Sequence, residues 1–304
     1  MYLRLRTPPT RRLSDSHRMQ KYLRLLRPHH YAKNLAVFMP LFFAVRITEL
    51  DLVLRNLVAF VLFSVLASAV YIFNDIRDLG EDREHPLKRH RPLAAGEIDL
   101  KSAVTVHIVL VVVSLLCAFL FQQHLFFILL SYFFLNVAYS LLLKHVPLID
   151  ICVISITFVL RIGAGAVVSG VELRMWMILI TFLLAMFLGM AKRREDVVLA
   201  AGGGTVRKAV DGYNVEFVNA AMVLMASVII VSYISYTISP EVMSRFKSEH
   251  LYVSVVFVIL GILRFLQLTF VGNERSDPTY ILLTDRFLQL IIAAWLATFL
   301  VLIY

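Results

Sequence analysis

Three aspartates in the stretch "NDIRDLGED" are the residues whose type and spacing point most directly to chemistry: Asp75, Asp78 and Asp82. At positions i, i+3 and i+7 they would share one face of a helix that continues beyond an apolar segment, with the Asn74 amide close by. Carboxylates so close together repel one another, and a bound divalent cation removes that repulsion. Mg²⁺ prefers such oxygen ligands and completes its shell with water and substrate phosphates. The spacing therefore predicts a site for Mg²⁺ and a diphosphate at Asn74, Asp75, Asp78 and Asp82. The alternative is a solvated acidic helix end that nearby Arg and Lys side chains neutralise.

A basic stretch, "HPLKRHRP", follows the aspartates directly. Its Lys88 and Arg89 are candidates to neutralise phosphate oxygens that a metal ion leaves uncovered, and His85 and Arg91 could contribute. The two prolines disfavour a continuous helix and predict a loop that folds back over the site. The alternative is a basic segment that only anchors the chain at the cytoplasmic side of a membrane.

The elements that must position these residues are apolar segments that span a membrane. The chain has 304 residues, of which 60% are hydrophobic, and this excludes an ordinary soluble domain. Apolar stretches of about 17–25 residues recur, each long enough to cross a hydrocarbon core. We predict an all-α polytopic membrane protein with nine spans: 35–48, 54–74, 102–121, 124–143, 148–168, 174–191, 215–238, 251–271 and 281–303.

The distribution of Lys and Arg predicts the orientation. With a cytoplasmic N-terminus, 23 of the 30 Lys and Arg residues fall in inside segments and five fall in outside segments, as the positive-inside rule expects. The basic character therefore reflects topology and gives no reason to expect a nucleic-acid partner. We predict a basic cytoplasmic arm over 1–20 and one transmembrane catalytic domain over 21–304, with long cytoplasmic loops at 75–101 and 192–214.

Other polar residues lie in apolar surroundings. Lys33 and Asn34 begin the first span and Lys144 ends the fourth, where phosphate contact competes with snorkelling to headgroups. Arg161 would lie roughly 20 Å into the fifth span. A charge at that depth is costly and usually faces a polar cavity or a partner, so we expect a functional role for Arg161.

These motifs resemble those of the UbiA-type intramembrane prenyltransferase superfamily. Its signature, Asn-Asp-x-x-Asp-x-x-x-Asp, is matched by Asn74, Asp75, Asp78 and Asp82. The resemblance implies a bundle of nine transmembrane helices whose active site opens to the cytoplasm at the inner membrane. The second aspartate motif of the aromatic prenyltransferases is replaced here by "AKRREDVV". That departure, together with "RPHHYAKN", "YSLLLKHVPLIDICV" and "FVLRIGAGA", resembles the decaprenyl-phosphate phosphoribosyltransferase branch of the superfamily.

The resemblance to this branch implies Mg²⁺-dependent transfer of 5-phosphoribose from 5-phosphoribosyl 1-diphosphate to a polyprenyl phosphate, for cell-envelope glycan precursors. It implies Asp75, Asp78 and Asp82 as the catalytic residues. The implied substrate-binding residues are Lys33, Asn34, Tyr71, Lys88, Arg89, Lys144, Arg161, Lys192, Arg193 and Glu195.

Two other functions are compatible with parts of the sequence. A prenyltransferase of the same fold would move a prenyl group from a prenyl diphosphate to an aromatic or other small acceptor, but the missing second aspartate motif disfavours it. A transporter or lipid-binding protein would place charges near the membrane midplane, whereas the charges here gather at one end of the spans.

Overall fold

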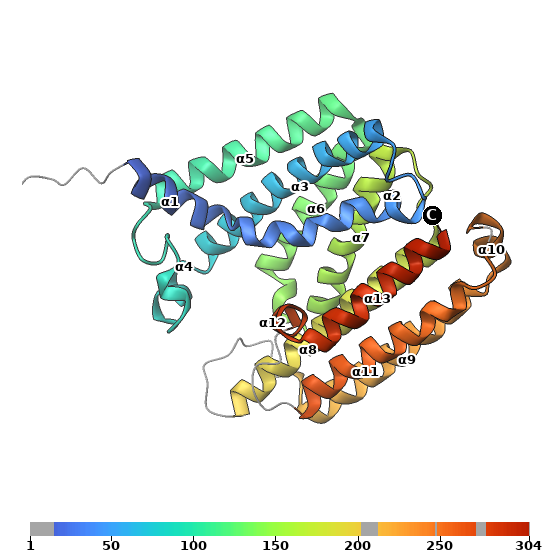
Figure 1. Cartoon of the computed structure of the whole chain (residues 1–304). Helices are drawn as coiled ribbons and strands as arrows, with labels where there is room; N and C mark the ends of the chain where they lie inside the picture. The colour runs from blue at the N-terminus through green and yellow to red at the C-terminus, as the bar shows by residue number, and fades with distance from the viewer. Residues whose placement is uncertain (1–14, 202–211, 247, 272–277, 304) are drawn as a thin grey trace, which may run out of the picture.

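The fold was analysed in a computed structural model, which describes residues 15–201, 212–246, 248–271 and 278–303 (Figure 1). Within these ranges the regular structure consists of helices, and no strand is formed. Residues 1–14 of the predicted N-terminal arm (1–20) and residues 202–211 of the predicted second loop lie outside the described ranges. Helix α1, Asp15–Leu26, precedes the bundle and packs on α3, Leu50–Arg77.

Eight helical segments in the described part are long and apolar enough to cross a membrane. They are α3; α5, Leu100–Phe121; α6, Gln123–Leu141; α7, Ile149–Ser169; α8, Met175–Ala201; α9, Val215–Thr237; η5 with α11, Leu251–Ser254 and Val255–Val271; and α13, Arg286–Ile303. Each coincides with one of the predicted spans, which confirms an all-helical, multi-pass membrane protein.

The first predicted span, 35–48, differs in form. Residues Pro28–Phe38 make a 3-10 helix, η1, and Met39–Phe43 make a short α-helix, α2, with Pro40 in its first turn. At about 2.0 Å per residue in η1 and 1.5 Å in α2, the pair is roughly 30 Å long. It packs against α3 and α7, but it is not among the eight candidate spans of the described residues, so the predicted count of nine is not confirmed.

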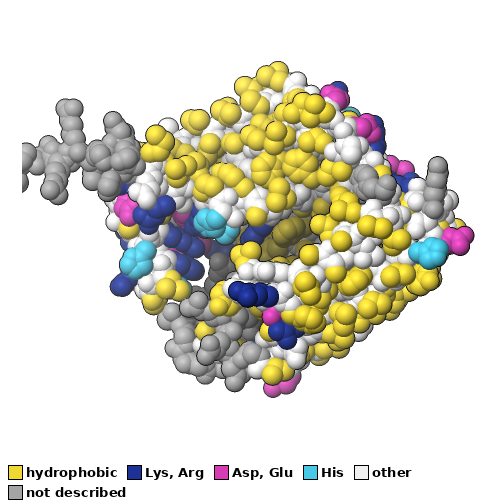
Figure 2. All heavy atoms as spheres, in the orientation of Figure 1, with side chains coloured by type: hydrophobic (Ala, Val, Ile, Leu, Met, Phe, Trp, Pro, Cys, Tyr) yellow, Lys and Arg dark blue, Asp and Glu magenta, His cyan; other side chains and the backbone are white. Residues whose placement is uncertain are grey.

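Helices α3 and α7 form the centre of the bundle. More than half of their apolar windows is buried, 61% and 56%, whereas α5 and α13 bury 11% and 17% and face outward. Gly165 permits the close packing of η1 on α7, because a Cβ atom there would lie 1.7 Å from the Val37 carbonyl oxygen. The outward faces carry exposed Val, Ile, Leu and Phe side chains, as lipid contact requires (Figure 2).

Three predicted boundaries were wrong. The helix that carries Asp75 ends at Arg77, and Asp78 (φ −93°, ψ 10°) separates it from α4, Leu79–Glu84. Helix α8 runs on to Ala201, so "KRRED" lies on a helix and not in the predicted loop. The last predicted span is interrupted, because α12, Pro278–Thr284, ends before Asp285, which accepts a hydrogen bond from the Leu288 amide in α13. Each difference concerns charged residues, about which apolar patterning gives no information.

Candidate functional site

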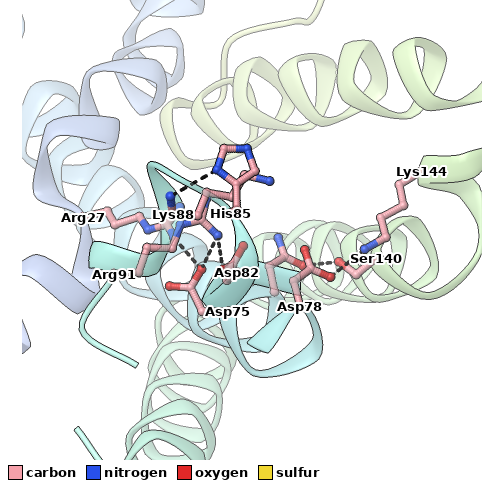
Figure 3. A network of polar contacts seen from close by, with 10 residues as sticks. Arg27, Asp75, Asp78, Asp82, His85, Lys88, Arg91, Ser140 and Lys144 are labelled. Carbon is pink, nitrogen blue, oxygen red and sulfur yellow. Dashed lines mark hydrogen bonds and ion pairs between the residues drawn. The ribbon is translucent and has the colours of Figure 1, made fainter. Parts of the chain in front are cut away.

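The acid cluster lies where α3 passes into α4 (Figure 3). Asp75 and Asp82 are buried, with 2% and 1% of their surface exposed. Arg91 Nη1 bridges them, at 3.1 Å from Asp75 Oδ1 and 2.6 Å from Asp82 Oδ2. Arg27 Nη2 contacts the same Oδ1 atom of Asp75 at 2.5 Å. Asp75 therefore contacts two guanidinium groups from separate parts of the chain, and it shares one of them, that of Arg91, with Asp82.

Asp78 points away from this pair. Lys144 Nζ, from the short helix η3 (Leu143–His145), contacts Asp78 Oδ1 at 2.7 Å, and the Ser140 hydroxyl donates to the neighbouring Asn74 amide oxygen. The prediction that the three aspartates share the face of one continuous helix was therefore wrong. The break at Asp78 divides the cluster into an Asp75–Asp82 half and an Asp78–Lys144 half.

The donor set of this cluster fits Mg²⁺ in its chemistry. Its ligand atoms are carboxylate and amide oxygens, and the second oxygen of Asp75, Oδ2, is buried without a hydrogen-bond partner among the described residues. Such a buried orphan costs about 1–3 kcal/mol unless a ligand satisfies it. Among the described residues no group of three or more acidic, His or Cys side chains could hold a metal ion, and in this cluster Arg91 contacts both Asp75 and Asp82.

The loop that carries Arg91 is held down by α1. Arg24 Nη1 contacts both carboxylate oxygens of Glu97 at 3.1 Å, and its Nη2 donates to the His90 carbonyl at 2.7 Å. Lys21 Nζ donates to the Glu97 carbonyl at 3.3 Å. The predicted loop folding back over the aspartates is thus confirmed, and Arg91 is the side chain that reaches them.

A basic pocket of about 540 Å³ lies beside the Asp75–Asp82 half. The charged and imidazole side chains that line it are Arg24, Arg27, His29, His30, His90 and Arg91, and within the described ranges no carboxylate lines it. Burial lowers the pKa of the His30 imidazole from 6.5 to about 4, assisted by the charges of Lys33, His29, Arg27 and Arg91. This pocket is suited to an anion, and Arg27 and Arg91 belong both to it and to the acid cluster.

The other basic residues predicted in the first loop are Lys88 and Arg89, which lie in sequence between the pocket-lining residues Leu87 and His90. Arg89, in η2 (Lys88–His90), is exposed and its Nε contacts His90 Nε2 at 3.4 Å. The amides of Leu87 and Lys88 donate to His85 Nδ1 at 3.2 and 3.3 Å, which shapes the turn.

Helix η1, which supplies His29 and His30 to the pocket lining, also carries Lys33. The guanidinium carbon of Arg27 lies 5.5 Å from the centroid of the Tyr71 ring. The centroids of the Tyr71 and His30 rings are 5.0 Å apart.

Sequence reasoning did not select Arg27, and it ranked Arg91 below Lys88 and Arg89. Arg91 stood within the quoted "HPLKRHRP", so only the loop geometry was missing. Arg27 is separated from Asp75 by 48 positions, and its one available signal was the "RPHHYAKN" stretch.

Arg161 is buried within the bundle. Its Nε donates to Asn34 Oδ1 at 2.8 Å, and the Asn34 amide donates to Ser64 Oγ at 2.9 Å. Three aromatic rings, Phe63, Tyr132 and Phe158, lie 5.0–5.2 Å from its guanidinium carbon. The expectation of a polar partner is confirmed: within the described part of the chain Arg161 forms no ion pair, and it fixes Asn34 of η1.

A second charged network surrounds the end of α8. Arg193 Nε contacts Asp150 Oδ2 at 2.6 Å, and its Nη1 contacts Asp196 at 2.7 Å. The Tyr213 hydroxyl donates to Asp150 Oδ1 at 2.9 Å and accepts from the Leu148 amide at 2.6 Å. Burial raises the pKa of Tyr213 to about 12. Lys192 and Glu195 form a separate pair along the helix. The network thus gathers around Asp150, whereas the acid cluster gathers around Arg91.

An apolar cavity of about 360 Å³ lies between α2, α8, α9, α11 and α13. Met39, Phe187, Phe265, Leu288 and Trp295 are among its lining residues. Figure 2 shows the face hollowed between the α2 and α13 sides, with hydrophobic side chains around the opening and Lys and Arg gathered toward the α1 and α4 end. The cavity has the character of a site for a hydrocarbon chain.

Comparison with known proteins gives consistent results. A model of the UbiA prenyltransferase family matches residues 36–206. The decaprenyl-phosphate phosphoribosyltransferase of Mycobacterium tuberculosis is 33% identical over 281 residues, which cover 91% of this chain and 92% of that protein. The enzyme of the same name from Corynebacterium glutamicum is 30% identical, over 97% of this chain and 89% of that protein.

The fold is also that of solved family members. A UbiA homolog from Archaeoglobus fulgidus, bound to DMAPP and Mg²⁺, superposes with a TM-score of 0.68 at 21% identity, covering 93% of this chain and 99% of that one. Together with the relatives above, this shows that the chain is a transferase of the UbiA prenyltransferase family and that its curated relatives place it in the decaprenyl-phosphate phosphoribosyltransferase branch.

Proposed function

We propose that the chain transfers the 5-phosphoribosyl group from 5-phosphoribosyl 1-diphosphate to a polyprenyl phosphate, such as decaprenyl phosphate, and releases diphosphate. The similarity to decaprenyl-phosphate phosphoribosyltransferases over more than 90% of the chain carries this proposal. The site supports it, because an acid cluster and a basic pocket lie side by side at one end of an apolar bundle. In the reaction, a phosphate oxygen of the acceptor forms a bond to the ribose C1 as the bond from C1 to the diphosphate oxygen breaks.

The metal-binding residues in this proposal are Asp75, Asp78 and Asp82, with the Asn74 amide oxygen. Mg²⁺ bound there would withdraw charge from the leaving diphosphate. The aspartates alone cannot hold an anionic substrate, because they carry the same charge. When they bind a metal ion, their present partners Arg91 and Lys144 become available to bind phosphate oxygens.

Cationic side chains hold the remaining phosphate charge. We assign Lys33, Lys88, Arg89 and Lys144 to donor or acceptor phosphates, and add Arg27 and Arg91 from the basic pocket. Cations already in place stabilise the charge that develops on the diphosphate, and in many enzymes such preorganised electrostatic stabilisation lowers the barrier more than any other effect. A phosphate monoester is already a competent nucleophile, so the reaction requires no catalytic base.

The remaining predicted residues position the site. We assign Arg161 and Asn34 to fixing η1, and Tyr71 to orienting Arg27 and His30. Lys192, Arg193 and Glu195 lie near the end of α8, and we assign them to holding that helix in place beside the site. The polyprenyl chain lies in the apolar cavity and reaches lipid through its opening. The site faces the cytoplasm at the inner membrane, on the side that carries the excess of Lys and Arg.

The test is transfer by the purified protein. With radiolabelled 5-phosphoribosyl 1-diphosphate, a polyprenyl phosphate and Mg²⁺, we expect label in an organic-soluble lipid, and none when EDTA replaces Mg²⁺. A parallel reaction offers a prenyl diphosphate and an aromatic acid. Absence of a labelled lipid together with turnover in the parallel reaction would assign the chain to the aromatic prenyltransferase chemistry instead.

A further inference from the structure

The two arginines of the Asp75–Asp82 half are shared by two places. Arg27 and Arg91 pair with the carboxylates, and both also line the basic pocket. An anion that enters the pocket therefore competes with Asp75 and Asp82 for the same two guanidinium groups. Within the described ranges, Arg27 donates to the carboxylates only through Nη2 and Arg91 only through Nη1, at 2.5–3.1 Å. A movement of either guanidinium toward an anion in the pocket therefore lengthens these contacts.

The charges of this half balance. Asp75 and Asp82 contribute two negative charges, and Arg27 and Arg91 contribute two positive charges. A divalent cation entering alone would leave the buried cluster with an excess of two positive charges, and a phosphate dianion entering alone would leave two negative charges. Uncompensated charge is costly in surroundings of low dielectric, so the two ions enter most favourably together.

The Oδ2 atom of Asp75 is the oxygen best placed to bind the metal ion first. Asp75 is 2% exposed, and among the described residues its Oδ2 atom has no hydrogen-bond partner while its Oδ1 atom has two. If an anion draws Arg27 and Arg91 into the pocket, Oδ1 of Asp75 and Oδ2 of Asp82 are freed next to this orphan oxygen.

We propose that the basic pocket is a binding site for a phosphate monoester, and that its occupation withdraws Arg27 and Arg91 from Asp75 and Asp82 and so prepares these carboxylates for a divalent cation. The monoester and the metal then bind with positive coupling, and by linkage each raises the affinity of the other by the same factor. The identity of the monoester rests on the proposed function, in which both the 5-phosphate of the donor and the acceptor lipid carry this group.

Binding in the absence of turnover tests this inference. Mn²⁺ serves as the metal probe, and its affinity for the detergent-solubilised full chain is measured by electron paramagnetic resonance, with correction for Mn²⁺ bound to free phosphate. One arm adds ribose 5-phosphate and the other adds farnesyl phosphate, so that the soluble and the lipid source are distinguished. For the wild-type chain we expect at least one of them to tighten Mn²⁺ binding about tenfold, within the range of known couplings.

Two variants locate the coupling. Arg91→Gln should bind Mn²⁺ alone more tightly than the wild type and lose most of the effect of the monoester, and Arg27→Gln should act in the same direction. Arg83→Gln is the matched control, because Arg83 is an exposed arginine of the same segment, and it should retain the wild-type coupling. Gel filtration and the thermal midpoint establish that each variant is folded, and if one fails to fold the other carries the test.

The inference is overturned if neither monoester changes the Mn²⁺ affinity of the wild-type chain. It is also overturned if the coupling persists unchanged in both Arg91→Gln and Arg27→Gln. Because no transfer is measured, the proposed function can fail while this coupling is found, and the coupling can be absent from a chain that transfers phosphoribose.

Discussion

The two charged networks at the ends of α3 and α8 contain the same residue types but differ in how completely they are satisfied. In the first, Arg91 is divided between Asp75 and Asp82, and Asp75 Oδ2 has no partner in the described part of the chain. In the second, both oxygens of Asp150 are used, one by Arg193 and one by Tyr213. A buried network with every group paired stabilises one conformation, whereas one with an orphan oxygen retains capacity for a ligand.

The surroundings of the two networks differ in the same sense. The first borders the basic pocket of about 540 Å³, which is lined by arginine and histidine side chains. The second ties the start of α7 to α8 and to Tyr213, and the Tyr213 hydroxyl also accepts a hydrogen bond from the Leu148 amide. We infer that the first network performs the chemistry and that the second holds α7 and α8 in register. Changes in the second should therefore affect stability, and changes in the first should affect turnover.

The largest expected effect is that of Asp150→Ala on stability. It leaves the Arg193 Nε and the Tyr213 hydroxyl buried without their partner, and removal of one member of a buried ion pair typically costs about 3–5 kcal/mol. We expect a clearly lower denaturation midpoint in detergent. The double variant Asp150→Leu with Arg193→Met should recover part of this loss, since it removes both charges.

Asp51→Ala provides the control, because Asp51 forms an exposed i,i+4 pair with Arg55. Such surface pairs contribute about 0–1 kcal/mol, so the midpoint should hardly move. An Asp150→Ala chain as stable as Asp51→Ala would show that the second network does not hold the helices together.

Asp78→Ala should have a smaller effect on the free energy of unfolding and should act mainly on turnover. The Asp78 carboxylate is 23% exposed and its partner Lys144 is 16% exposed, so loss of this pair should destabilise the chain less than loss of the buried Asp150–Arg193 pair. Turnover of phosphoribose should fall by roughly 10²–10³-fold, the usual result of removing one preorganised electrostatic contact. Transfer assays and denaturation midpoints on the same preparation measure both quantities. Retained turnover would remove Asp78 from the metal-binding residues.

The fold could largely be predicted from the sequence because its main determinant is local. Apolar runs of a given length must cross the membrane as helices, and eight predicted spans coincide with helical segments of the structure. The errors arose where tertiary partners decide. Helix α8 continues through "KRRED" because Asp150 neutralises Arg193 from another helix, and the last span breaks at Asp285, which pairs with Arg264 at 2.7 Å.

The candidate site could be predicted by residue type but not by pairing. The acids were recognised because carboxylates gathered at the end of an apolar segment are typical ligands of a divalent cation. Their partners could not be chosen, because Lys88, Arg89 and Arg91 are close together in a loop and only its fold, held by Arg24 through the His90 carbonyl, presents Arg91 to Asp82. Arg27 reaches Asp75 across 48 positions of sequence, and no local pattern encodes that contact.

A third expected effect appears only on acidification and sharpens the distinction between the two networks. The pKa of His30 in the folded chain is about 4, below the value of 6.5 in an unfolded chain, because of burial and the charges of Lys33, His29, Arg27 and Arg91. Between these two values the unfolded chain binds more protons than the folded one, so stability must fall as the pH decreases from about 6.5 to 4. His30→Gln should lose this share of the pH dependence.

Denaturation midpoints at pH values of about 4.5, 5.5, 6.5 and 7.5 span this window and measure the effect. His124→Gln, which changes an exposed histidine outside the basic pocket, is the control that should follow the wild type. A monoester bound in the pocket would supply negative charge beside His30, raise its pKa and flatten the decline in the wild type. The same ligand should leave the pH profile of His30→Gln nearly unchanged. If the wild type and His30→Gln lose stability in parallel on acidification, other groups are responsible for the pH dependence. The burial and the cations of the pocket would then not lower the pKa of His30.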